Sequence, residues 1–215
     1  MNKLRYQPYY RRHLPHTQPP GATFFITFRL ANSLPPEVLE KLQEDRAAIE
    51  VAISKITDSD EKRQRQEIER KKWFTKWDDA LDQVQTGDFY LREPKVAATV
   101  ANSIRFHDGK WFDVIAYCLM PNHVHLVITP FEKTADQEYS LSEILHNIKR
   151  NSAKQSNKIL GRTGDFWQHE SYDHFIRDDA ELERVVKYVL HNPVKAGLCS
   201  EWTDWQWSYS KYPML

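Results

Sequence analysis

The stretch of sequence that decides the fold is Leu119-Met-Pro-Asn-His-Val-His-Leu-Val-Ile-Thr129. Its Pro121-Asn122 pair is typical of a tight turn, and the apolar residues on either side predict two strands joined as a hairpin. Side chains two residues apart on a strand point the same way, so His123 and His125 share one face. Two neutral imidazoles on one face form half of a metal site. Because the chain has nine histidines, this spacing also arises by chance.

The elements around this hairpin predict the fold class. Working outward, we expect a strand over 22–30, a helix over 94–105, strands over 111–120 and 123–129, a helix from 141, a strand over 165–176 and a last helix from 179 that ends at Asn192-Pro193. This βαββαβ order predicts an α+β fold: a ferredoxin-like antiparallel sheet with helices packed on one face, plus a helical insertion after the first strand.

Composition sets further limits on the function. The 215 residues fit one domain over 1–215, and Lys plus Arg equals Asp plus Glu at 30 each, so a nucleic-acid partner cannot be inferred from net charge. The two cysteines, Cys118 and Cys199, form no CxxC pair, which suits a reducing compartment. No apolar run reaches about eighteen residues. We therefore expect a soluble, cytoplasmic protein with no membrane partner.

Three stretches depart from the compact pattern. Residues 1–21 form a basic, proline-rich N-terminal arm without an acidic residue, residues 37–76 form a charged helical insertion, and residues 199–215 form a tryptophan-rich C-terminal tail. Mixed-sign charges at helical spacing favour a solvated surface helix for the insertion over a nucleic-acid contact.

Two local groups of cations are candidates for DNA phosphate contacts. Arg11 and Arg12 lie in the arm, and Arg150, Lys154 and Lys158 follow one another at four-residue spacing along a predicted helix. An ordinary solvated helix face explains the second group equally well.

The last helix supplies residues that complement the two histidines. At about 100° per residue, Tyr188 and Asn192 lie about 40° apart at the edge of its apolar stripe. Taken alone, Tyr188 is a packing residue and Asn192 a helix cap. Together with His123 and His125, the Asn192 amide oxygen could complete a divalent site for Mn²⁺ or Mg²⁺, and ligand type does not exclude zinc. Tyr188 then becomes a candidate nucleophile that forms a 5′-phosphotyrosine bond.

At this point the sequence resembles the REP-associated tyrosine transposases, which are HUH single-tyrosine transposases. The similar segments are Leu14-Pro-His, Gly21 to Leu30, Ser33-Leu-Pro, Met120-Pro-Asn-His-Val-His-Leu-Val, Phe166-Trp-Gln, Asp173-His-Phe-Ile-Arg177 and Tyr188-Val-Leu-His-Asn-Pro-Val-Lys-Ala-Gly-Leu198. The resemblance implies a ferredoxin-like core, a divalent metal, and cleavage and joining of single-stranded DNA near a hairpin. By this similarity His123 and His125 are metal ligands, Tyr188 is the nucleophile and Asn192 is the third ligand.

Three functions remain open at this stage. The first is a metal-dependent DNA nuclease and strand transferase that acts at repetitive extragenic palindrome hairpins through Tyr188. The second is a non-catalytic hairpin-binding protein derived from a transposase, and the third is a metal hydrolase that uses activated water. A monomer would draw the site from one chain, and a homodimer could share it between two.

Overall fold

The computed structural model describes residues 9–11, 15–134 and 137–212. The chain divides into two compact units, Met1–Ala31 with Phe89–Leu215, and Asn32–Asp88. The first unit carries a five-stranded sheet, and the second carries two long helices.

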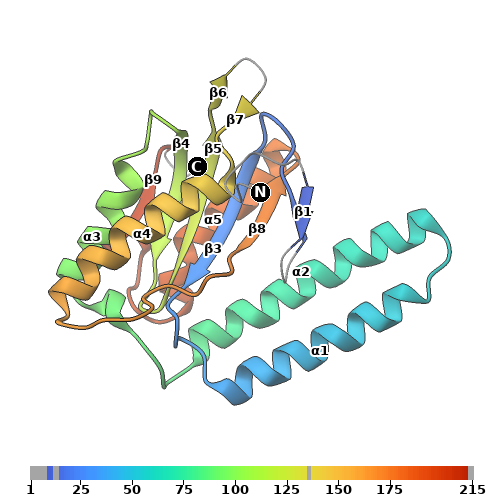
Figure 1. The fold of residues 1–215 in the computed structure, drawn as a ribbon, viewed down its shortest axis with the longest axis horizontal. Coiled ribbons are helices and arrows are strands. Elements are labelled where there is room, and N and C mark those ends of the chain that lie inside the picture. The colour runs from blue at the N-terminus through green and yellow to red at the C-terminus, as the bar shows by residue number, and fades with distance from the viewer. Residues whose placement is uncertain (1–8, 12–14, 135–136, 213–215) are drawn as a thin grey trace. The chain divides into compact units, whose positions relative to one another are not determined.

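The sheet of the first unit is antiparallel and has the order β8-β3-β5-β4-β9 (Figure 1). Its strands are β3 (Thr23–Arg29), β4 (Phe112–Leu119), β5 (His123–Pro130), β8 (Tyr172–Ile176) and β9 (Ser208–Ser210). Two short pairs accompany it, β1 (Tyr9–Arg11) with β2 (Pro15–Thr17) and β6 (Glu132–Thr134) with β7 (Gln137–Glu138). The predicted α+β class with an antiparallel sheet is confirmed.

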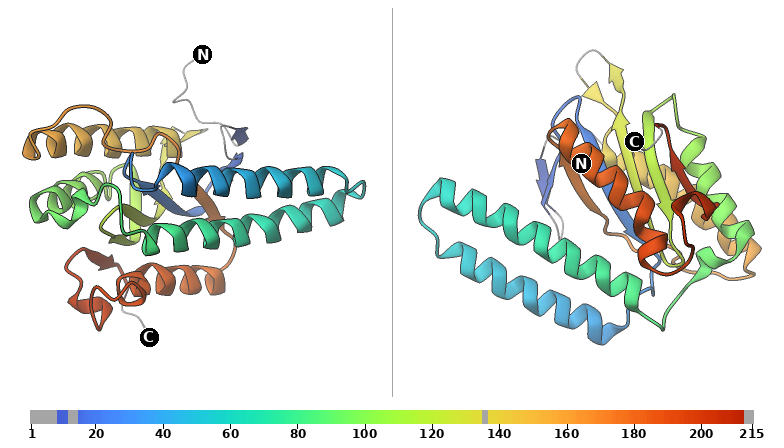
Figure 2. Two further views of the ribbon diagram at one scale, coloured as in Figure 1. Left: turned by 90° about the horizontal axis from the view of Figure 1, so that it is seen from below. Right: turned by 180° about the vertical axis from the view of Figure 1, so that it is seen from behind.

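The two faces of this sheet differ in their cover. One face packs against α3 (Pro94–Arg105) and α4 (Leu141–Ile159) and forms the main apolar core, to which the strands contribute Phe24, Ile26, Phe28, Val124, Leu126 and Ile128. On the other face lies α5 (Asp179–Lys195), as the two views of Figure 2 show. Alternation along β3 and β5 therefore sends Thr27 and His125 to the α5 side, while their neighbours fill the core.

The end of α5 corrects the sequence prediction that Asn192-Pro193 stops this helix. Pro193 lies inside α5, which continues to Lys195. A proline removes one backbone donor but leaves later donors available, and Ala196 N donates to Asn192 O at 2.9 Å. Asn192 and Pro193 are both buried, so packing against the sheet offsets the cost of the proline. Asn192 is consequently a residue within the helix rather than its cap.

The second unit is a helical hairpin of α1 (Pro36–Ser54) and α2 (Ser59–Gln83) that follows β3 in the chain. A small core of Leu34, Leu42 and Leu81 holds its two helices together. Many of its surface charges are paired within the hairpin, including Arg46 with Glu50, Arg65 with Glu69, and Lys71 with Glu67. This pairing agrees with a solvated charged surface.

The chain returns to the sheet after α5. A short 3-10 helix, Trp202–Asp204, precedes β9, and Trp205 Nε1 donates to Leu119 O at 2.9 Å. Among the residues that the structure describes, no helix combines the length and apolar character needed to cross a bilayer.

Candidate active site

His123 and His125 lie at the start of β5, on the face of the sheet that α5 covers, and both are fully buried. Their Nε2 atoms are 2.9 Å apart. His123 Nδ1 donates to Asn122 Oδ1 at 2.7 Å, and His125 Nδ1 lies 2.9 Å from Thr27 Oγ1 on β3. When both rings carry their proton on Nδ1, their two Nε2 lone pairs face one point, which only a proton or a cation can occupy favourably.

Asn192 completes this cluster from α5. Its Nδ2 lies 3.1 Å from His125 Nε2, and its Oδ1 is buried without a hydrogen-bond partner. A buried amide oxygen without a partner is costly unless another group satisfies it. Rotating the amide by 180° turns Oδ1 toward the two Nε2 atoms. Two imidazole nitrogens and one amide oxygen are a donor set that fits a divalent metal ion.

Burial keeps the His125 imidazole neutral. Desolvation, helped by the positive charge of Lys195, lowers the pKa of His125 from 6.5 to about 3. At neutral pH its Nε2 therefore keeps the lone pair that metal binding requires.

Tyr188 lies one turn before Asn192 on α5 and is half-buried. Its ring centroid is 5.6 Å from that of His125 and 6.0 Å from that of Phe25, with edge-to-face geometry in both cases. Helix α5 thus brings the phenol and the amide of the predicted site to the two histidines of β5. These four residues, which sequence reasoning selected, meet at one place.

The predicted DNA-contact residues on α4 do not join this cluster. Arg150, Lys154 and Lys158 are exposed on α4, which covers the opposite face of the sheet. Arg11 lies in β1, where the structure describes only the backbone, and Arg12 lies outside the described residues.

Sequence reasoning did not assign roles to Thr27, Asn122 and Lys195. Thr27 stands opposite His125 in the β3–β5 register, and Asn122 precedes the first histidine. A polar residue within the apolar run of β3 was the available signal for Thr27. No such signal pointed to Lys195, because the helix was expected to end before this residue.

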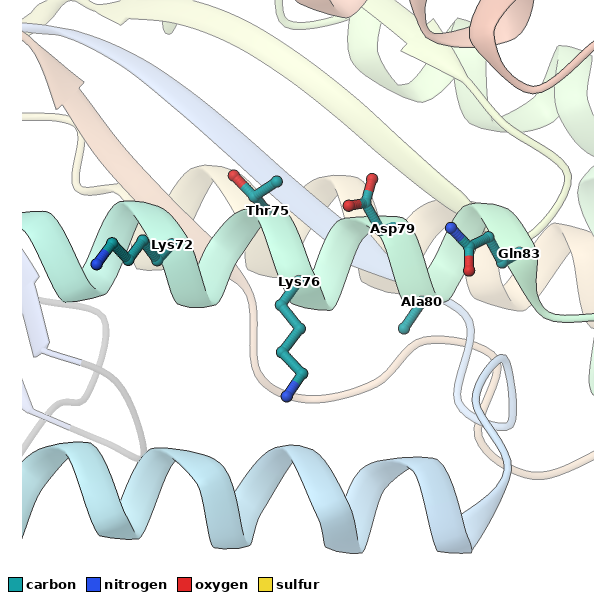
Figure 3. A pocket seen from close by; sticks show the side chains of 6 residues that line it. All are labelled: Lys72, Thr75, Lys76, Asp79, Ala80 and Gln83. Atoms are coloured by element: carbon teal, nitrogen blue, oxygen red, sulfur yellow. The ribbon is translucent and has the colours of Figure 1, made fainter.

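Two hollows lie on the helical hairpin. Figure 3 shows the side chains on α2 that line one of them: Lys72, Thr75, Lys76, Asp79, Ala80 and Gln83. Lys76 extends toward α1, where it pairs with Asp45. A second hollow is lined by residues of the same two helices, among them Val38 and Leu42. Neither hollow includes the histidines, Tyr188 or Asn192.

Comparisons with known proteins indicate what this chain is similar to, and the match of the family model includes these four residues. The family model of IS200-like transposases matches residues 93–192. A Haemophilus influenzae protein, provisionally named a REP-associated tyrosine transposase, is 28% identical over 102 residues, which cover 45% of this chain and 58% of the relative. The REP-associated tyrosine transposase of Escherichia coli K12 is 29% identical over 97 residues, or 45% of this chain and 53% of the relative. The chain thus spans little more than half the length of these curated relatives.

A solved structure extends the likeness beyond that region. The structure of a REP-associated tyrosine transposase bound to a REP hairpin aligns with 93% of this chain and 80% of its own, with a TM-score of 0.51 and 18% identity. At this identity the alignment shows a shared fold.

Proposed function

We propose that this chain, whose resemblance to the REP-associated tyrosine transposases is confirmed, cleaves and joins single-stranded DNA at hairpins of the repetitive extragenic palindrome kind. The observation that carries the proposal is the meeting of Tyr188 and Asn192 on α5 with His123 and His125 on β5. A packing tyrosine or a capping asparagine would not require the other three residues nearby.

His123, His125 and Asn192 are proposed to hold a divalent metal ion, Mg²⁺ or Mn²⁺. When bound, such an ion supplies Lewis-acid polarisation of the scissile phosphate. The protein supplies the ligand orientation, because Asn122 and Thr27 hold the Nδ1 sides of the two imidazoles.

Tyr188 is proposed to be the nucleophile. Its Oη forms a bond to phosphorus as the bond from phosphorus to the 3′ oxygen breaks, which leaves a 5′-phosphotyrosine and a 3′-hydroxyl. The phenol releases a proton to water and the leaving oxygen takes one from water, so no net proton is consumed. The phosphotyrosine bond retains the phosphodiester energy, and a 3′-hydroxyl can therefore reverse the step and join strands.

Basic residues outside the cluster are proposed to bind DNA. We propose that residues 1–215 act as one functional domain in the cytoplasm, as a monomer or a homodimer, and that Arg11 and Arg12 of the arm 1–21 contact phosphates. Arg150, Lys154 and Lys158 would contact the hairpin away from the cleavage centre, because α4 covers the opposite face of the sheet.

The test is covalent capture of DNA. Wild-type protein is incubated with a labelled single-stranded hairpin oligonucleotide and Mn²⁺, and the product is resolved on a denaturing gel. We expect a protein–DNA adduct that disappears in Tyr188→Phe and persists in Tyr209→Phe, a matched hydroxyl deletion on β9, where Tyr209 stacks on Tyr117. His123→Ala should lose the adduct while it still binds the hairpin.

The other two functions give different results in the same experiment. Hairpin binding by wild type without an adduct would favour the non-catalytic binding protein. Cleavage that continues in Tyr188→Phe would favour a hydrolase that uses activated water.

A further inference from the structure

We propose that Lys195 binds a non-bridging oxygen of the scissile phosphate and is the third functional side chain of α5, after Tyr188 and Asn192. This inference rests on the proposed function and extends it to a residue that the sequence analysis did not assign. It follows from where α5 ends, which side of the helix faces the histidines, and the charge of the residue.

Because α5 continues through Pro193 to Lys195, helical geometry applies to all three residues. At about 100° per residue, Lys195 lies about 20° to one side of Tyr188 and Asn192 about 40° to the other. The three side chains therefore project from one sector about 60° wide.

This sector of α5 faces the histidines. Asn192 Nδ2 lies 3.1 Å from His125 Nε2, and the Tyr188 ring centroid lies 5.6 Å from that of His125. Lys195 itself is exposed.

The charge of Lys195 suits the chemistry of the proposed reaction. Attack by a phenol on a phosphodiester concentrates negative charge on the non-bridging oxygens, and a positioned cation stabilises that charge most in the transition state. A lysine ammonium is a compact charge with three donors, which suits this role. Lys187 carries the same charge on the same helix, but it projects about 100° away from Tyr188.

The experiment compares Lys195→Met, which removes the charge and keeps the length, with Lys195→Arg and with the matched control Lys187→Met. The single-turnover rate of adduct formation is measured at saturating hairpin oligonucleotide and Mn²⁺, on the normal phosphate and on each phosphorothioate diastereomer of the scissile phosphate. Mn²⁺ binding and thermal unfolding are measured on every variant, because a cation in the last turn also interacts with the helix dipole.

We expect Lys195→Met to slow adduct formation on the order of 10- to 100-fold, Lys195→Arg to retain most of the rate, and Lys187→Met to match wild type. The penalty of Lys195→Met should shrink on one phosphorothioate diastereomer, whose sulfur replaces the oxygen that lysine binds. Equal rates for Lys195→Met and Lys187→Met, or an equal penalty on all three phosphates, would overturn the role of Lys195 alone. Failure of wild type to form any adduct would overturn the proposed function, and the role of Lys195 with it.

Discussion

Thr27 Oγ1 lies 2.9 Å from His125 Nδ1, although 98 residues separate them in the chain. The contact follows from the antiparallel register of β3 and β5, which sets the two residues directly opposite each other. Thr27 is fully buried, so its hydroxyl has this imidazole as a partner in place of water. The contact fixes the ring of His125 with Nε2 toward His123 and Asn192.

Thr27→Val removes this hydroxyl and keeps the shape of the side chain. We expect Mn²⁺ affinity to fall by roughly 10-fold or more, because partners of metal-binding histidines orient the ring. Thr23→Val is the matched control, since Thr23 lies on the same strand and bonds Thr129 Oγ1 at 2.7 Å. Isothermal titration with Mn²⁺ measures both variants. Equal losses in the two would show that the Thr27 hydroxyl has no specific role at the site.

Asn192→Ala removes the proposed amide ligand. We expect Mn²⁺ affinity to fall by about 10-fold or more, whereas Asn192→Asp should retain binding because a carboxylate oxygen also ligates this ion. Asn147→Ala on α4 is the control, since Asn147 bonds within its own helix to Glu143 O. Electron paramagnetic resonance of free Mn²⁺ gives the bound fraction. Unchanged binding in Asn192→Ala would remove this residue from the ligand set.

The sequence predicted which residues would lie together better than it predicted what surrounds them. Periodicity places His123 with His125 and Tyr188 with Asn192, because it depends only on local geometry. It does not fix which face of the sheet a helix covers, and the expectation that the helices pack on one face was wrong for α5, which lies on the face opposite α3 and α4 (Figure 2). Periodicity therefore could not show that Lys154, on α4, lies on the face of the sheet opposite the histidines. The local rule that a proline ends a helix also failed at α5, where burial of Pro193 outweighed it.

The stability of the metal-free protein should fall as the pH is lowered. The pKa of His125 is about 3 in the folded protein and near 6.5 when unfolded, so between these values the unfolded chain binds a proton that the folded chain does not. The free energy of unfolding therefore decreases toward acid by up to about 1.4 kcal/mol per pH unit from this group. Urea unfolding in EDTA at pH 7.5, 6.0 and 5.0 measures the slope.

His125→Gln should remove that part of the pH dependence, and His191→Gln should leave it intact. His191 lies on α5 as well, where its Nδ1 contacts Lys187 O. If wild type and His125→Gln show the same slope, His125 is not the group responsible.

Glu181→Ala should loosen the start of α5. Glu181 is buried, with Oε1 at 2.9 Å from His174 Nε2 and Oε2 accepting from Arg177 N at 3.0 Å. Its removal leaves these groups unsatisfied, and we expect a loss of about 1–3 kcal/mol of stability. Since α5 carries Tyr188, adduct formation should slow as well. Glu183→Ala, at an exposed position of α5, is the control and should change neither thermal unfolding nor the adduct rate.

The last prediction concerns the exposed cations of α4. If the hairpin reaches this helix, replacing Arg150, Lys154 and Lys158 together by alanine should weaken binding and reduce the slope of log Kobs against log salt by about 2 to 3, because each phosphate contact releases counterions. Adduct formation at saturating hairpin should stay unchanged, since α4 and α5, the helix that carries Tyr188, lie on opposite faces of the sheet (Figure 2). Fluorescence anisotropy across a salt series measures the slope. A slope equal to that of wild type would mean that these three residues form an ordinary solvated face, and that the DNA stays on the α5 side.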